Sequence, residues 1–157
     1  MGMAEGGDMW YLKNNGILAR CTDMYRDERF RPLGLNSRQS VLLLQVCRYP
    51  GVKQDALSKA IFIDKSNITR QMAALEEAGL VTRCPDEEDR RQVRVFPTEK
   101  ALTLLPEIRA GFWEWREYLQ EGLSEKELKL FCDVMDKVTR RAAAWCGRMV
   151  IQGEEEP

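Results

Sequence analysis

Apolar side chains recur along most of this chain at the three- and four-residue spacing of α-helices. Read together with the turn residues between them, this spacing predicts helices over about 9–31, 36–49, 53–60, 64–78, 98–121 and 124–148. Between the fourth and fifth helices, β-branched runs predict two short strands at 80–84 and 93–96, joined by a turn. The pattern therefore predicts a mainly α fold with one small β-hairpin.

Polar and glycine residues suited to helix ends stand at these boundaries. The predicted N-caps are Asn36 (in a capping box with Gln39), Asp64, Thr98 and Ser124 (in a capping box with Glu127), and the predicted C-cap is Gly79. Pro97 has no backbone N–H to donate, so we expect the second strand to end early.

The segment 54–77 predicts two short helices around a tight turn, and the hairpin 80–97 follows directly. This is the order of a winged helix-turn-helix, which places one helix in the DNA major groove and a β-wing beside it. The apolar stripe of the second helix is Ile68, Met72 and Leu75, so its early polar residues face away from the core. We therefore predict DNA contacts from Lys65, Ser66, Asn67, Thr69 and Arg70.

The turn of the hairpin carries Asp89, Arg90 and Arg91. An arginine there can enter a narrow minor groove, where the potential is most negative. Asp89 is expected to hold one guanidinium by a charge-assisted pair. The alternative is a solvated, charged hairpin tip, and the neighbouring Glu87 and Glu88 would repel phosphate.

Bulk charge gives no support for DNA binding, because the net charge is −1 and residues 51–100 carry as many acidic as basic side chains. Any positive field must be local. Weaker candidates for phosphate contacts are Ser37, Arg38, Gln39, Lys53 and Gln54. The alternative function is an interaction module that keeps this fold without binding DNA.

The two last predicted helices carry more apolar surface than a small lobe needs. Their heptad-like stripes are Ala101, Leu105, Ile108, Phe112, Trp115 and Leu119, then Leu128, Phe131, Met135, Val138, Ala142 and Trp145. Packing within the same chain is one interpretation. We favour a dimer interface formed by the helices in 9–31 and 98–148, because a helix-turn-helix protein usually binds a two-fold symmetric DNA site as a symmetric dimer.

The residue types needed for several other classes of protein are missing. The chain has no histidine, no Gly-rich phosphate loop and no nucleophile elbow, so we expect neither an enzyme nor a cofactor. Five scattered cysteines without a CxxC pair predict no zinc site and no disulfide framework. Without a signal peptide or membrane span, we expect a cytoplasmic protein with disordered tails at 1–8 and 149–157.

Several short motifs in this sequence together resemble those of one protein family. They are Leu33-Gly34-Leu35 followed by Gln39, Pro50-Gly51-Val52 with Gln54, Ile63-Asp64-Lys65-Ser66, Thr69-Arg70, Leu75-Glu76 with Gly79-Leu80, and a wing pattern filled by Asp89, Arg91, Val95 and Thr98. From about residue 10 to 148 the chain resembles the multiple-antibiotic-resistance regulator (MarR) family of transcription factors.

The resemblance implies a winged-helix homodimer whose terminal helices interlock and whose recognition helices bind a short palindrome. It also implies a repressor that a small aromatic or anionic ligand releases from the DNA, with the ligand in a cleft beside the DNA-binding lobe. Arg20, Tyr25 and Trp115 are our candidates for lining that cleft, although each could instead be a core or dimer contact.

Three departures limit what the resemblance implies. Pro97 replaces the leucine usual before Thr98, and the absence of histidine leaves no metal-sensing ligand of that type. The peroxide-sensing branch has a reactive cysteine near the start of its first helix. Here the nearest is Cys21, about two turns deeper on a face that we expect to be buried, so a cysteine-based redox regulator is the less favoured alternative.

Overall fold

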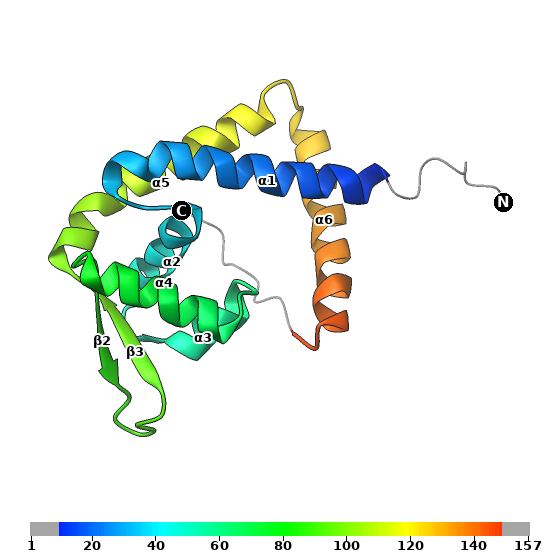
Figure 1. The fold of residues 1–157 in the computed structure, drawn as a ribbon. Coiled ribbons are helices and arrows are strands. Elements are labelled where there is room, and N and C mark those ends of the chain that lie inside the picture. The colour runs from blue at the N-terminus through cyan, green and yellow to red at the C-terminus, as the bar shows by residue number, and fades with distance from the viewer. Residues whose placement is uncertain (1–9, 149–157) are drawn as a thin grey trace.

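The structure is a computed structural model that describes residues 10–148, and the predicted disordered tails lie outside that range. The elements, shown in Figure 1, are α1 (Trp10–Phe30), the 3₁₀ turn η1 (Arg31–Leu33), α2 (Ser37–Arg48), β1 (Val52–Lys53), α3 (Gln54–Ala60), α4 (Lys65–Glu77), β2 (Val81–Pro85), β3 (Val93–Pro97), α5 (Glu99–Gln120) and α6 (Glu125–Trp145). All six predicted helices and both predicted strands are present, with ends within about three residues of expectation. β1 was not predicted, because two residues are too few to show a pattern.

The predicted helix ends are confirmed in atomic detail. Asn36 accepts the backbone N–H of Gln39 at 2.9 Å, and the Gln39 side chain accepts the N–H of Asn36 at 3.0 Å. Ser124 and Glu127 form the second capping box. Gly79 has a φ of 72°, the left-handed conformation that glycine adopts without steric cost after a helix.

The three strands form one antiparallel sheet in the order β1-β3-β2. The prediction that the second strand ends early is wrong, since β3 continues through Pro97, which lies opposite Val81. Thr98 donates its N–H to the Leu80 carbonyl at 3.1 Å, so by strand alternation the nitrogen of Pro97 points away from β2. The missing donor therefore costs no ladder hydrogen bond with β2.

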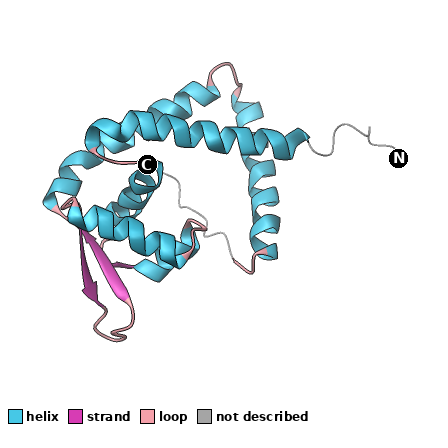
Figure 2. Cartoon of the chain, in the orientation of Figure 1, coloured by secondary structure: helices cyan, strands magenta, loops and turns pink. Residues whose placement is uncertain are grey.

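One hydrophobic core joins α2, α4, the sheet and the first half of α5. The predicted apolar stripe of α4 is confirmed: Ile68, Met72 and Leu75 are at most 1% exposed. They pack in a cluster that also contains Leu42, Leu43, Val46, Leu57, Leu80, Val81, Val95, Ala101 and Ile108. We call the part of the chain from α2 to β3 the winged lobe. Its hairpin projects from the helices, as Figures 1 and 2 show.

Helices α1 and α5 lie side by side above the winged lobe (Figure 1). Between them, Gly111 of α5 leaves room for the fully buried ring of Phe30. Tyr25 stacks on Trp115 with 4.6 Å between ring centroids, and its hydroxyl donates to the Gly111 carbonyl at 2.9 Å. These contacts fix α5 against α1 within one chain.

The apolar stripes of α5 and α6 have different surroundings. In α5, Ala101 and Ile108 are fully buried in the chain's own core, so the single-chain interpretation holds for that half of the helix. In α6, by contrast, Phe131 is 52% exposed and Trp145 is 90% exposed. Within residues 10–148, no other helix or strand packs extensively against α6.

Cys21 does not lie on a buried face. It is exposed in this single chain, which corrects the sequence-based expectation. The reason is that α1 is covered by α2 and α5 along one side only, and little in its sequence marks that side. Whether its thiol senses oxidants stays a prediction.

Candidate nucleic-acid interface

The helix-turn-helix consists of α3, a turn and α4. Asp64 caps α4 by accepting the N–H of Asn67 at 2.8 Å. Hydrogen bonds from the Ser66 hydroxyl and then from that N–H hold the pKa of Asp64 below its usual value. The turn contains Phe62 at φ 56°, the one left-handed residue other than glycine among residues 10–148. The start of α4 is therefore tightly defined.

All five predicted recognition residues lie in the first two turns of α4. Lys65, Ser66, Thr69 and Arg70 are exposed, whereas Asn67 is half-buried and accepts a hydrogen bond from Gln71. Their exposed side is opposite the buried stripe, so the polar face points away from the core. Within the described range Arg70 forms no ion pair, and its guanidinium can reach a ligand.

Two of these residues also have partners inside the lobe. Lys65 pairs with Asp55 of α3 at 2.8 Å. Thr69 donates its hydroxyl to the Lys65 carbonyl at 2.9 Å and accepts the Gln54 amide at 3.1 Å. Gln54 thus ties α3 to α4, a role that the sequence did not suggest.

The other predicted phosphate contacts divide by position. Arg38 is exposed, while the side chain of Gln39 is used in the capping box of α2. Ser37 is buried, its hydroxyl donating to Asp23 and its N–H to Asp27, both at 2.6 Å. The structure therefore corrects the prediction for Ser37, which faces α1 and cannot meet a phosphate.

The wing places Arg90 and Arg91 at its exposed tip, as predicted. Asp89 has a different role from the one expected, because it accepts the N–H of Arg91 at 3.1 Å and forms no ion pair in the described chain. It shapes the turn and holds no guanidinium. The carboxylate that does is the buried Asp86, which accepts from Arg94 and was missed because it stands in an acidic run.

Two contacts connect the wing with the helix-turn-helix, one with α4 and one with α3. Arg83 of β2 donates to Glu76 of α4 at 2.9 and 2.7 Å, and the Arg83 N–H adds a third bond at 3.0 Å. At the other end of the hairpin, Gln92 contacts Asp55, whose pKa is lowered mainly by its hydrogen bond to Lys65. The wing tip and the start of α4 therefore belong to one connected surface.

A groove of about 1380 Å³ lies between α1, α2, α5 and α6. Its lining mixes aromatic rings with arginines: Phe112, Trp113, Trp115, Arg26, Arg48, Arg109 and Arg116. Of the three predicted cleft residues, Trp115 lines this groove. Arg20 and Tyr25 do not, because Arg20 is exposed on α1 and the hydroxyl of Tyr25 is turned toward Gly111.

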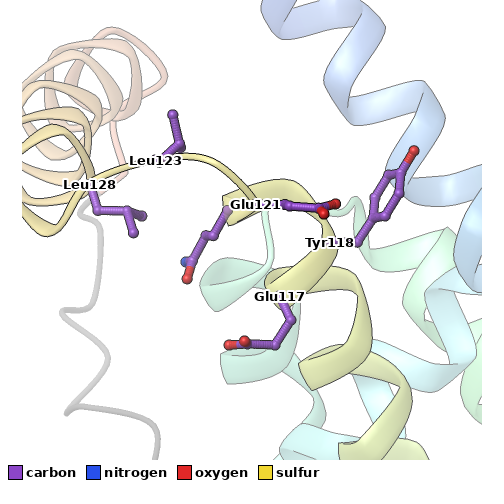
Figure 3. A pocket seen from close by; sticks show the side chains of 6 residues that line it. Glu117, Tyr118, Glu121, Leu123 and Leu128 are labelled. Atoms are coloured by element: carbon purple, nitrogen blue, oxygen red, sulfur yellow. The ribbon is translucent and has the colours of Figure 1, made fainter.

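A second, smaller hollow of about 510 Å³ lies at the turn from α5 to α6 (Figure 3). Glu117 and Glu121 line it together with Leu123 and Leu128. An anion there would meet two carboxylates, so the larger groove is the better candidate for an anionic ligand.

The described residues contain no group of three His, Cys, Asp or Glu side chains arranged to hold a metal ion. Across the same 10–148 span, none of the helices is both long and apolar enough to cross a membrane.

Comparison with known proteins gives concordant matches. Residues 33–92 match the model of the MarR family. The HTH-type transcriptional regulator YybA of Bacillus subtilis (strain 168), itself uncharacterized, is 26% identical over 129 residues, which cover 82% of this chain and 86% of YybA.

Solved structures agree with the fold. A MarR transcriptional regulator from Methanosarcina mazei Go1 has a TM-score of 0.80 at 29% identity, over 86% of this chain and 97% of that one. A Listeria monocytogenes protein assigned to the MarR family, complexed with 26mer DNA, has a TM-score of 0.79 at 27% identity, over 83% and 87% of the two chains. Each of these proteins is described as a transcriptional regulator, and none as an enzyme.

Proposed function

We propose that the chain is a winged-helix transcriptional regulator of the MarR family, and that it binds double-stranded DNA sequence-specifically as a homodimer and represses transcription. The observation that carries this proposal is the shared surface of α4 and the wing. On it, Arg70 is exposed on the recognition helix, and Arg90 and Arg91 are exposed at the wing tip. The Listeria relative bound to DNA supports the same use of the fold.

The two parts of this surface suit different grooves. Arg70 can donate to the two acceptors of a guanine edge in the major groove, and Ser66 and Asn67 can meet bases or phosphates nearby. The wing-tip arginines can enter the adjacent minor groove. Local geometry thereby compensates for the overall net charge of −1.

Unburied apolar surface supports the homodimer. Phe131, Val134 and Val138 repeat along α6 and are 44–52% exposed, and Trp10 and Met24 of α1 are 67% and 70% exposed. A second copy could cover both helices at once. Two-fold symmetry would then present two α4 helices to the half-sites of a palindromic operator about one helical turn apart.

The groove beside the winged lobe supports release by a small ligand. Its arginines favour an anion and its aromatic rings favour a flat apolar body, so we propose an aromatic anion as the effector. Because α2, α5 and α6 all contribute to the lining, a bound ligand can change how the lobe sits on the dimerisation helices.

The test is binding of the purified protein to its own upstream intergenic DNA and to scrambled duplex over a salt series. We expect a preference for the native fragment and an affinity that falls as salt rises. Arg70→Ala should weaken specific binding by about 1–3 kcal/mol and relax specificity at one base pair. Arg31→Ala removes an exposed arginine of η1, outside the winged lobe, and is the matched control that should bind like the wild type.

Negligible binding to every duplex, even at low salt, would contradict the proposal. It would favour the alternative of an interaction module without DNA binding, for which the acidic wing residues Glu87 and Glu88 are the supporting observation. If binding is specific, adding aromatic carboxylates to the bound complex then tests release by an effector.

A further inference from the structure

Asp86 is the one fully buried carboxylate in the described chain, at 1% exposure, although it lies at the base of an exposed hairpin turn. Burying a carboxylate is costly unless it is both paired and hydrogen-bonded. A residue in this position therefore calls for a physical reason, and its contacts supply one.

Each oxygen of Asp86 binds a different part of the wing. Oδ1 accepts the N–H groups of Glu88 at 3.1 Å and Asp89 at 2.9 Å, which shapes the turn. Oδ2 accepts from Nε of Arg94 and lies 3.7 Å from Nζ of Lys53. The backbone of Asp86 also closes the turn by donating its N–H to the Gln92 carbonyl at 2.9 Å.

Arg94 and Lys53, the two basic residues beside Asp86, extend these contacts into the rest of the winged lobe. Arg94 donates through Nη1 to the Gly51 carbonyl at 3.1 Å and pairs with Lys53 in the ladder of β1 and β3. Lys53 immediately precedes Gln54, whose amide binds Thr69 on α4. A continuous series of contacts therefore runs from the wing turn to the recognition helix.

We propose that Asp86 is a positioning residue for DNA binding: through Arg94 and Lys53 it fixes Arg90 and Arg91 at the wing tip relative to α4. This inference rests on the proposed function. Without the contacts of Asp86 with Arg94 and Lys53, the wing tip would still form but would sample more positions. Ordering it on DNA would then cost conformational entropy. Asp86 itself touches no DNA.

The direction in which Asp86→Asn changes the affinity for DNA distinguishes a positioning role from a purely electrostatic one. Asp86→Asn keeps an oxygen for the two turn N–H groups but loses the charge that holds Arg94 and Lys53. If only charge mattered, removing a negative charge near DNA would strengthen binding. The positioning role predicts the opposite, a loss of about tenfold in affinity. Glu87→Gln, an adjacent exposed carboxylate, is the matched control and should bind as well as the wild type or slightly better.

A double-mutant cycle with Arg91→Ala shows whether the loss acts through the wing tip. We expect Asp86→Asn to cost less affinity in the Arg91→Ala background than in the wild type, because one of the two arginines that it positions is gone. Arg94→Lys keeps the charge but loses the two-pronged contact with Asp86 and Gly51, so it should show the same pattern. It also serves as the second variant if Asp86→Asn folds poorly by circular dichroism.

The outcomes are distinguishable in one set of titrations. Equal or tighter binding by Asp86→Asn, or a loss that persists undiminished in the Arg91→Ala background, would overturn the positioning role while leaving DNA binding intact. Absence of binding by the wild type to any duplex would overturn the proposed function and this inference with it.

Discussion

The winged lobe and helix α6 contain the same kinds of apolar side chain but bury them to opposite extents. Leu42 and Leu43 of α2 are fully buried, whereas Phe131 of α6 is 52% exposed. Both helices begin with a complete capping box, so their local stability signals are alike. The difference shows that the lobe completes its core within one chain, and the exposed stripe of α6 supports the proposal that a second copy covers it.

The largest effect should come from the core of the lobe. Leu43→Ala leaves a cavity among side chains that cannot collapse into it, so we expect a loss of about 2–5 kcal/mol in the free energy of unfolding. Urea denaturation measures it. The control is Leu102→Ala, at a position 42% exposed on α5, which should change stability little. Similar losses for both variants would mean that the lobe is not the packed unit described here.

The next effect should come from α6 and should appear in association. Phe131→Lys puts a charge in the middle of the exposed stripe, and we expect the dimer dissociation constant to rise at least about 30-fold. Sedimentation velocity over a concentration series measures it. Asp133→Lys introduces the same side chain on the opposite side of α6 and should leave association unchanged. A monomeric wild type would contradict the proposal that a second copy covers the exposed stripe of α6.

A substitution at the contact between α1 and α5 should have an intermediate effect on stability. A Cβ on Gly111 would lie 2.6 Å from the buried Phe30 ring, so Gly111→Ala should destabilise the protein by about 1 kcal/mol despite the better helix propensity of alanine. Gly16→Ala is the control within α1, where the nearest atom is the movable end of Arg20 at 3.4 Å. It should be stabilising by about 0.5–1 kcal/mol. Thermal unfolding of the two variants checks these opposite signs.

The smallest effect concerns the half-buried ion pair between Glu76 of α4 and Arg83 of β2. The hydrogen bond from Arg83 holds the pKa of Glu76 below its usual value. The pair therefore contributes stability above the unfolded glutamate pKa of about 4.3, and this is lost as the pH falls through the lower folded pKa. The melting temperatures of wild type and Glu76→Gln should differ at pH 7 and converge in acid. A constant difference would show that the pair contributes no pH-dependent stability.

Periodicity and capping predicted the elements well because both are local properties. The Ile68, Met72 and Leu75 stripe and the caps at Asn36, Asp64 and Ser124 depend on residues within two turns of one another. Pro97 was misjudged because its effect depends on which strand its nitrogen faces, and that is set by register with β2.

The site was predicted in part for the same reason. The polar face of α4 follows from helix geometry, so its residues could be named in advance. The burial of Ser37 against α1, the clamp at Asp86 and the arginines of the groove depend on elements distant in sequence. Among acidic residues in one run, no local signal distinguishes Asp86 from Glu87 or Glu88.

The central claim is that the winged lobes bind DNA and that α1, α5 and α6 form the dimer interface, so that one dimer binds both half-sites of the operator. Native mass spectrometry of the protein with a duplex selected from random sequence tests it most directly. We expect two chains per duplex for the wild type, with Phe131→Lys losing both that complex and most of the affinity. A one-chain complex of undiminished affinity, formed by either protein, would contradict the claim.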